Sequence, residues 1–142
     1  MDDCIFCKII KEEIPAQKVY EDEDILAFLD VNPVEKGHTL IITKEHYSDI
    51  LEIPEDLLTK VSSMTQKLTK AINKGLGVED FNILQNNGIK AGQTVSHYHV
   101  HIIPRYREFK LCLGIGPIKT EDEIRDPKLC NKEIADLIIK EI

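Results

Sequence analysis

Three of the chain's five histidines stand at every second position, within the run HYHVHII at residues 97–103. The run is rich in β-branched and aromatic residues, which favour extended backbone. Side chains two positions apart on a strand point to the same face and lie about 6.6 Å apart along it. The alternation therefore predicts a strand with the three imidazoles on one face and Tyr98, Val100 and Ile102 on the other.

A row of imidazoles can serve as a nucleophile, as a proton donor or acceptor near neutral pH, or as metal ligands. The segment Gly92-Gln93-Thr94 stands directly before the row. Glycine lets the backbone approach a ligand closely. The backbone N–H groups of Gln93 and Thr94, with the Thr94 hydroxyl, are candidates to hold phosphate oxygens. The combination predicts an anion pocket that faces a nucleophilic histidine.

A second candidate site begins with Cys4 and Cys7, which form a C-x-x-C. The motif occurs in redox pairs, in zinc sites and by chance. The redox alternative expects a βαβ context, which this position does not offer. A structural zinc site needs four ligands, and His46 and His97 are candidates for the other two. Spacing alone leaves the zinc site open. His38, which follows a turn glycine, either reaches a site at a sheet end or lies on the surface.

Bulk properties narrow the functional classes. A length of 142 residues predicts one domain spanning 1–142, with a core at 4–106 and a C-terminal arm and helix at 107–142. The net charge of −7 argues against binding of nucleic-acid polymers, which relies on basic surface. No apolar run approaches the roughly 18 residues of a membrane helix. The sequence shows no signal peptide, and four cysteines fit free thiols or metal ligands in the cytoplasm.

The remaining patterns predict a sheet with helices packed on it. Short β-favouring runs between turn residues stand at 19–21, 25–29, 38–43 and 81–85, and the histidine strand is expected to end near Pro104. The second and third of these runs are expected to pair antiparallel. Shorter helices are expected at 8–13 and after a capping Asn131.

One long helix is expected between Pro54 and the glycines at 75 and 77. A proline and acids in the first turn favour its start, and glycine favours its end. Its apolar positions step by three and four, which gives one buried stripe: Leu57, Val61, Met64, Leu68 and Ala71.

Together these residues resemble the histidine triad (HIT) family, whose signature is His-φ-His-φ-His-φ-φ with φ apolar. Residues 97–103 carry the signature, and GQTV precedes it at 92–95. The similarity runs in register from about Cys4 to Arg105 and includes CIFCKII at 4–10, AFLD at 27–30 and GHTLII at 37–42. The segment after Tyr106 matches little of the family.

The resemblance implies an α+β fold, in which about five antiparallel strands carry a long helix and shorter ones. It also implies a homodimer that continues the sheet. The implied chemistry is nucleotidyl transfer to His99, which would attack the α-phosphate of a purine nucleotide derivative. Water would then release the nucleoside monophosphate. His101 and His38 would lie beside His99 and assist.

The resemblance also assigns binding residues by position. Asp30 stands where the family binds ribose, and the phosphate-contacting positions are Asn86, Gly92, Gln93 and Thr94.

Similar members with an N-terminal cysteine pair bind one structural zinc per chain, and the matching ligands here are Cys4, Cys7, His46 and His97.

Two features point to different branches of the family. Asn86 and the C-x-x-C resemble the branch that hydrolyses nucleoside phosphoramidates. Pro104 and Arg105 resemble the branch that splits diadenosine polyphosphates. The leaving group therefore stays open. Two other classes are alternatives: a nucleotide-binding or interaction module with incidental activity, and a metal-binding protein that holds zinc in the histidine row.

Overall fold

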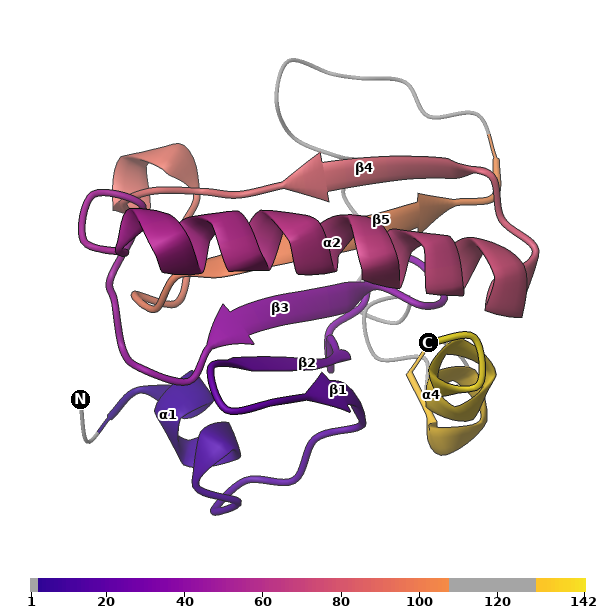
Figure 1. Ribbon diagram of the computed structural model, residues 1–142, viewed down its shortest axis with the longest axis horizontal. Coiled ribbons are helices and arrows are strands. Elements are labelled where there is room, and N and C mark those ends of the chain that lie inside the picture. Colours follow the sequence, from indigo (N-terminus) through magenta and orange to yellow (C-terminus); the bar gives the residue numbers. More distant parts are fainter. Residues whose placement is uncertain (1–2, 108–129) are drawn as a thin grey trace.

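The structure, a computed structural model, describes residues 3–107 and 130–142. Five antiparallel strands form one sheet in the order β1-β2-β3-β5-β4 (Figure 1). The strands are β1 (Lys18–Glu21), β2 (Ile25–Leu29), β3 (Thr39–Thr43), β4 (Asp80–Leu84) and β5 (His99–Arg105). The helices are α1 (Ile5–Ile10), α2 (Glu55–Leu76) and α4 (Lys132–Ile139), with a 3-10 turn η1 (Ile89–Ala91). The predicted antiparallel sheet is confirmed.

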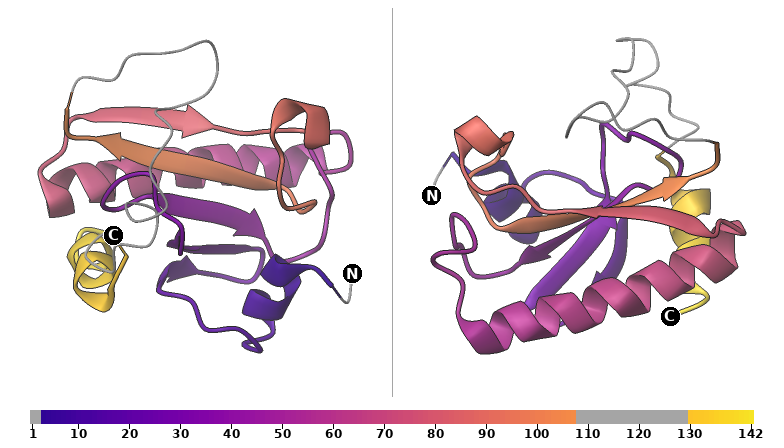
Figure 2. Two further views of the ribbon diagram at one scale, coloured as in Figure 1. Left: turned by 180° about the vertical axis from the view of Figure 1, so that it is seen from behind. Right: turned by 90° about the horizontal axis from the view of Figure 1, so that it is seen from above.

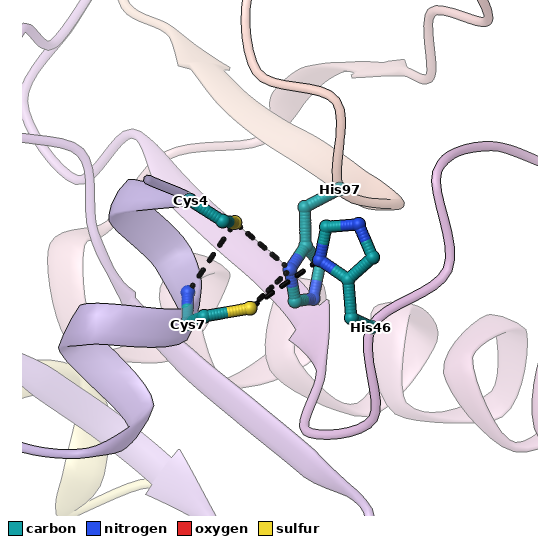
Figure 3. Close-up of side chains that lie close together, drawn as sticks. All are labelled: Cys4, Cys7, His46 and His97. Atoms are coloured by element: carbon teal, nitrogen blue, oxygen red, sulfur yellow. Dashed lines mark hydrogen bonds between the residues drawn. The ribbon is translucent and has the colours of Figure 1, made fainter. Parts of the chain in front are cut away.

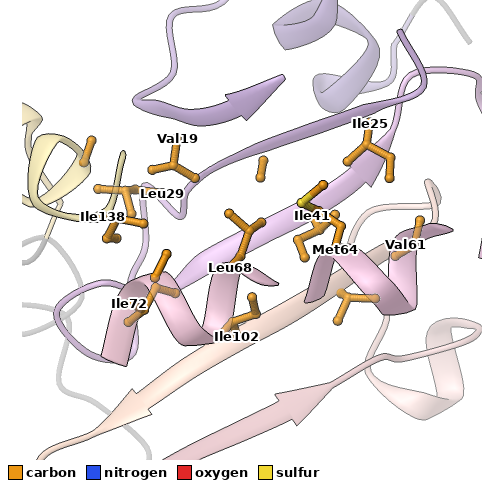
Figure 4. Packing of buried hydrophobic residues seen from close by; sticks show 14 of the residues in the cluster. Val19, Ile25, Leu29, Ile41, Val61, Met64, Leu68, Ile72, Ile102 and Ile138 are labelled. Carbon is orange, nitrogen blue, oxygen red and sulfur yellow. The ribbon is translucent and has the colours of Figure 1, made fainter. Parts of the chain in front are cut away.

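Helix α2 covers one face of the sheet, and α1 lies on the other (Figure 2). The α2 stripe packs on residues of β2, β3 and β5 to form the main core (Figure 4). Glu55 and Asp56 occupy the first turn, where the positive end of the helix dipole stabilises their negative charges. Gly77 ends the helix in a left-handed conformation, with φ of 65°. The long predicted helix is confirmed. Its apolar stripe packs against the sheet face opposite to that of His99 and His101.

Gly75 does not end α2, contrary to the prediction. It lies inside the helix, where a Cβ atom would stand 2.2 Å from the carbonyl oxygen of Leu137. The glycine is needed because α4 crosses α2 at close range. α4 itself was expected, and the Asn131 side chain caps it by accepting the Ile134 N–H at 3.0 Å.

The histidine face of the sheet is the one that α1 covers. Leu40 of β3 pairs with His101, and Ile42 pairs with His99. Directly paired residues point to the same face, and Leu40 and Ile42 belong to a second core cluster that includes Phe6 of α1. Val100 and Ile102 belong instead to the core under α2. The predicted separation of imidazoles from apolar residues is therefore correct for His99 and His101.

His97 does not lie on the strand, which corrects the prediction for the third imidazole. β5 begins at His99, and the His97 N–H donates to the Val95 carbonyl at 2.9 Å in a bend. The strand also continues through Pro104 to Arg105. Pairing with β3 ends at Ile102, so the missing N–H of proline breaks no bond on that side.

Helix α1 starts earlier than residue 8, where the sequence predicted it. Cys4 precedes its first turn and accepts the Cys7 N–H on its sulfur at 3.4 Å. The second cysteine thus lies inside the helix. Most of the C-terminal arm falls outside the described residues. Within 3–107 and 130–142, no helix is both long and apolar enough to cross a membrane.

Candidate active site and metal centre

His99 lies at the start of β5 with its ring almost fully buried. Its Nδ1 is 2.7 Å from the carbonyl oxygen of His97. A carbonyl only accepts hydrogen bonds, so Nδ1 carries the proton and Nε2 keeps its lone pair. Burial lowers the pKa of His99 below its usual value. The imidazole is thus held as the tautomer whose Nε2 can attack an electrophile.

His101 is connected to His38 by a hydrogen bond of 2.9 Å between His101 Nδ1 and His38 Nε2. The Val34 N–H donates to His38 Nδ1 at 2.9 Å. An N–H donor requires an unprotonated acceptor, so a neutral His38 carries its proton on Nε2 and donates it to His101 Nδ1. His101 then presents Nε2–H. Burial, with His99 nearby, lowers the pKa of His101 to about 4, so His101 is a neutral hydrogen-bond donor at neutral pH.

Asp30 follows β2 and lies beside these histidines. Its Oδ2 is 3.6 Å from His38 Nε2, and its Oδ1 accepts the Asn32 N–H at 2.9 Å. Asp30, His38 and His101 each place a ligand-type atom within 4.8 Å of the others. Burial raises the pKa of Asp30 to about 6. The structure thus brings together Asp30, His38 and His101, which the sequence analysis named as site residues.

The second group, here called the Cys/His cluster, consists of Cys4, Cys7, His46 and His97 (Figure 3). Their ligand atoms all lie within 4.8 Å of one another. His46 comes from the loop after β3, while α1 and the bend before β5 supply the others. Three segments far apart in sequence thus meet at one point.

The Cys/His cluster fits a tetrahedral zinc ion. His46 Nδ1 is 3.3 Å from Cys7 Sγ, and His97 Nδ1 is 3.4 Å from Cys4 Sγ and 3.6 Å from Cys7 Sγ. Zinc bond lengths to sulfur and nitrogen place such atoms about 3.6 Å apart at tetrahedral angles. His97 Nε2 lies 2.7 Å from the Thr43 carbonyl, so it carries the proton and leaves Nδ1 free to bind. A carbonyl partner of this kind commonly orients a metal-binding histidine.

The loop before the histidines is braced mainly by Gln93. Its side chain accepts the Gly88 N–H and donates to the Ser48 carbonyl, each at 2.7 Å. Its backbone N–H already donates to the Gly88 carbonyl at 3.1 Å. The Gln93 N–H thus donates within the loop in this structure, and its expected phosphate-binding role stays a prediction. Thr94 remains exposed at the tip of the segment.

Gly92 has a φ of 86° and Asn86 Nδ2 is 3.4 Å from the Gly92 carbonyl. These two predicted residues therefore belong to the same loop as Thr94.

Sequence reasoning missed three contributors to the site. The Val34 N–H and the Thr43 carbonyl fix histidine tautomers, but backbone groups leave no mark in residue type. Phe6 places its ring edge-on to His99, with centroids 5.1 Å apart. Its position between Cys4 and Cys7 was the one available signal for it.

Comparison with known proteins agrees with this arrangement. Residues 11–108 match the family model of the HIT domain. The chain belongs to the HIT family. An uncharacterised HIT-like protein of Methanocaldococcus jannaschii is 50% identical over 119 residues, which cover 84% of this chain and 92% of that protein. The adenosine 5′-monophosphoramidase of Schizosaccharomyces pombe is 45% identical over 123 residues, which cover 84% of this chain and 89% of that one.

Solved HIT structures share the fold. A Zn-bound histidine triad family protein of Mycobacterium smegmatis superposes with a TM-score of 0.79 at 32% identity and covers 99% of this chain and 93% of its own. The HIT fold is thus established for this chain, and one solved relative with that fold is Zn-bound.

Proposed function

We propose that this protein cleaves purine nucleotide derivatives at the α-phosphate through a covalent nucleotidyl intermediate on His99. The observation that carries the proposal is the 2.7 Å contact between His99 Nδ1 and the His97 carbonyl. That contact places the lone pair on Nε2, which is the atom that must attack phosphorus. The named activity of the S. pombe relative, adenosine 5′-monophosphoramidase, supports the same class of substrate.

The reaction has two displacements. His99 Nε2 attacks the α-phosphorus, a bond between Nε2 and phosphorus forms, and the bond to the leaving group breaks as that group takes a proton from solvent. Water then attacks the phosphorus and gives a proton back to solvent, the bond between Nε2 and phosphorus breaks, and nucleoside monophosphate leaves. His99 is regenerated, so the net reaction is hydrolysis.

His101 assists by hydrogen bonding to phosphate oxygens rather than as a strong acid. The bond from His38 leaves the proton of His101 on Nε2, and the lowered pKa of His101, about 4, keeps its ring neutral at neutral pH. A donor fixed in place before the reaction stabilises charge that develops on the phosphate. Asp30, beside His38, is proposed to bind the ribose.

The loop from Asn86 to Thr94 is proposed to hold the phosphate. Thr94 supplies the hydroxyl, with Asn86 and Gly92 shaping the segment. Gln93 is assigned a supporting role, because both its side chain and its N–H bond within the protein.

We also propose one structural zinc per chain in the Cys/His cluster. The four ligand atoms match a Cys2His2 donor set, which is typical of closed structural zinc sites. Bound there, the ion cross-links the start of the chain, the loop after β3 and the bend before β5.

The proposed homodimer is supported by the edge of the sheet. β4 is an edge strand of the described sheet, and its Ile83 and Leu84 are 50% and 40% exposed. Exposed apolar residues on an edge strand favour pairing with another chain. Light scattering that gives the mass of a monomer would remove this part of the proposal.

The decisive experiment compares turnover of an adenosine phosphoramidate with turnover of diadenosine polyphosphates. We expect the phosphoramidate to be the better substrate. Arg105, the feature that resembles the diadenosine branch, lies six residues along β5 from His99, which is about 20 Å on a strand. Its Nε donates to Asn82 at 2.7 Å. Preference for the polyphosphates would reverse the assignment of the leaving group, and no turnover of either would contradict the proposed function.

A further inference from the structure

We propose that the Cys/His cluster positions the nucleophile, with His97 and Phe6 as the two positioning residues that link ligation at the cluster to the imidazole of His99. The inference rests on the function proposed above for His99. It gives the cluster a role beyond stabilising the fold.

The first link is the backbone of His97. The ladder of β5 begins at His99, so pairing with β3 does not fix the carbonyl of His97. The N–H of the same peptide group, that of Tyr98, donates at 2.6 Å to the carbonyl of Tyr47, the residue after the cluster member His46. His97 itself adds three contacts: Nε2 to the Thr43 carbonyl at 2.7 Å, Nδ1 to Cys4 Sγ at 3.4 Å, and N–H to the Val95 carbonyl at 2.9 Å. The first two are made by the ring. Loss of the ring contacts, with a shift of Tyr47 next to His46, is therefore expected to move the peptide group whose carbonyl orients His99.

The second link is the aromatic ring of Phe6. It stands in α1 between the two cysteines and meets His97 and His99 edge-on, with centroids 5.8 Å and 5.1 Å away. α1 has six residues, and so short a helix is not stable alone. Its place on the sheet depends on packing and on what its cysteines bind. The Phe6 ring also packs on Phe28, with centroids 5.7 Å apart, and it is expected to shift when the cysteines on either side of it lose their ligand.

Loss of ligation is expected to release both links together. His99 could then exchange to the tautomer with its proton on Nε2, which cannot attack phosphorus. The substrate contact proposed for Asp30, which lies beside His38 and outside the cluster, would stay. The expected kinetic signature is therefore a fall in kcat with little change in KM.

The Cys/His cluster borders a surface cavity. A cavity of about 410 Å³ is lined in part by Cys4 and His46, together with Thr94 and Ser96. We therefore expect a chelator to reach the cluster in the folded protein.

The test follows the tautomer of His99 by NMR of protein labelled with ¹⁵N in histidine, in three states: loaded with Zn²⁺, stripped by a chelator, and loaded again. We expect one tautomer with protonated Nδ1 when loaded, an averaged signal when stripped, and recovery on reloading. kcat should fall at least about tenfold, as for a misplaced reacting group, while KM stays within about twofold. A stripped, folded protein that keeps the single tautomer and its kcat overturns the proposal.

Two variants separate positioning from general destabilisation. Phe6→Leu keeps all four ligands, so it should bind one Zn²⁺ and still show a partly averaged His99 signal and a lower kcat. Val61→Ala removes a residue that is 1% exposed on the opposite face of the sheet. It should melt earlier and leave the His99 signal unchanged.

If the stripped protein unfolds, Phe6→Leu decides, and an unchanged tautomer and kcat in that variant refute the inference. A wild-type protein with a single His99 tautomer under metal control but no turnover contradicts the proposed function and leaves the positioning intact.

Discussion

The carbonyl oxygen of His97 lies 2.7 Å from Nδ1 of His99, so a residue of the Cys/His cluster also orients the proposed nucleophile. The ring of His97 contacts Cys4 Sγ, and its backbone carbonyl accepts the hydrogen bond from His99 Nδ1. Two histidines that look equivalent in the sequence therefore have different surroundings and different proposed roles.

The metal assignment predicts that Cys4→Ser binds less than one zinc per chain. Structural zinc contributes directly to folding, so the variant should also melt earlier, by more than about 5 °C. Metal analysis and thermal unfolding measure the two effects. Cys130→Ser is the matched control, because Cys130 lies outside the cluster; it should keep one zinc per chain. A wild-type protein without zinc and a Cys4→Ser variant with an unchanged melting temperature would remove the site.

The hydrogen bond from His38 to His101 predicts that His38→Ala lowers kcat by about 10²-fold, the lower range for loss of a positioned proton-transfer or hydrogen-bonding group. Without His38, His101 is free to place its proton on either nitrogen. Steady-state kinetics with adenosine phosphoramidate measures the change, and zinc content should not move.

Tyr106→Phe is a suitable control for His38→Ala. The Tyr106 hydroxyl donates to the Lys36 carbonyl at 2.7 Å, next to the same turn, but it takes no part in the histidine contact. Its kcat should stay close to that of the wild type. Equal kcat values for His38→Ala and wild type would refute the assigned role of His38.

Buried Asp30 predicts a pH-dependent effect on stability. Burial raises its pKa to about 6 in the folded protein, against about 3.9 in an unfolded chain. The folded state therefore binds the proton more tightly, and this contribution to stability is present below pH 4 and lost as pH rises through 6. Asp30→Asn should gain unfolding free energy relative to wild type between pH 4 and pH 7.5, by up to about 3 kcal/mol.

Denaturant unfolding at several pH values tests the effect of Asp30→Asn. Asp136→Asn changes an exposed residue of α4, whose partner Lys132 is also exposed, so its effect should vary little with pH. An equal difference in unfolding free energy between Asp30→Asn and wild type at pH 4 and pH 7.5 would contradict the raised pKa of Asp30.

Period-two patterning predicted the histidine face correctly because side-chain direction on a strand follows sequence position alone. It failed at His97, because where a strand begins depends on partners from elsewhere in the chain, here the Thr43 carbonyl and the cysteines. The α2 stripe was predictable for the same local reason as the strand face. The crossing of α4 over Gly75 was not, since it depends on a contact with Leu137 that is distant in sequence.

Side-chain chemistry was more readable from the sequence than backbone chemistry. Residue types indicated the donor set of the Cys/His cluster, whereas spacing alone left zinc open. The roles of the Val34 N–H and the Gln93 N–H depend on loop conformation, which residue type does not determine. That is why the tautomer of His38 and the hydrogen bond from the Gln93 N–H to the Gly88 carbonyl went unpredicted.

The most direct test of the central claim is brief mixing of the protein with adenosine phosphoramidate labelled on the phosphate, followed by acid-free quenching and mapping of the labelled peptide. The account predicts a phosphorus–nitrogen adduct on His99 in the wild type. In His99→Ala it predicts no adduct, and a kcat lower by about 10³-fold or more, as expected when a nucleophile is removed. Full turnover by His99→Ala, or a label on another residue, would contradict it.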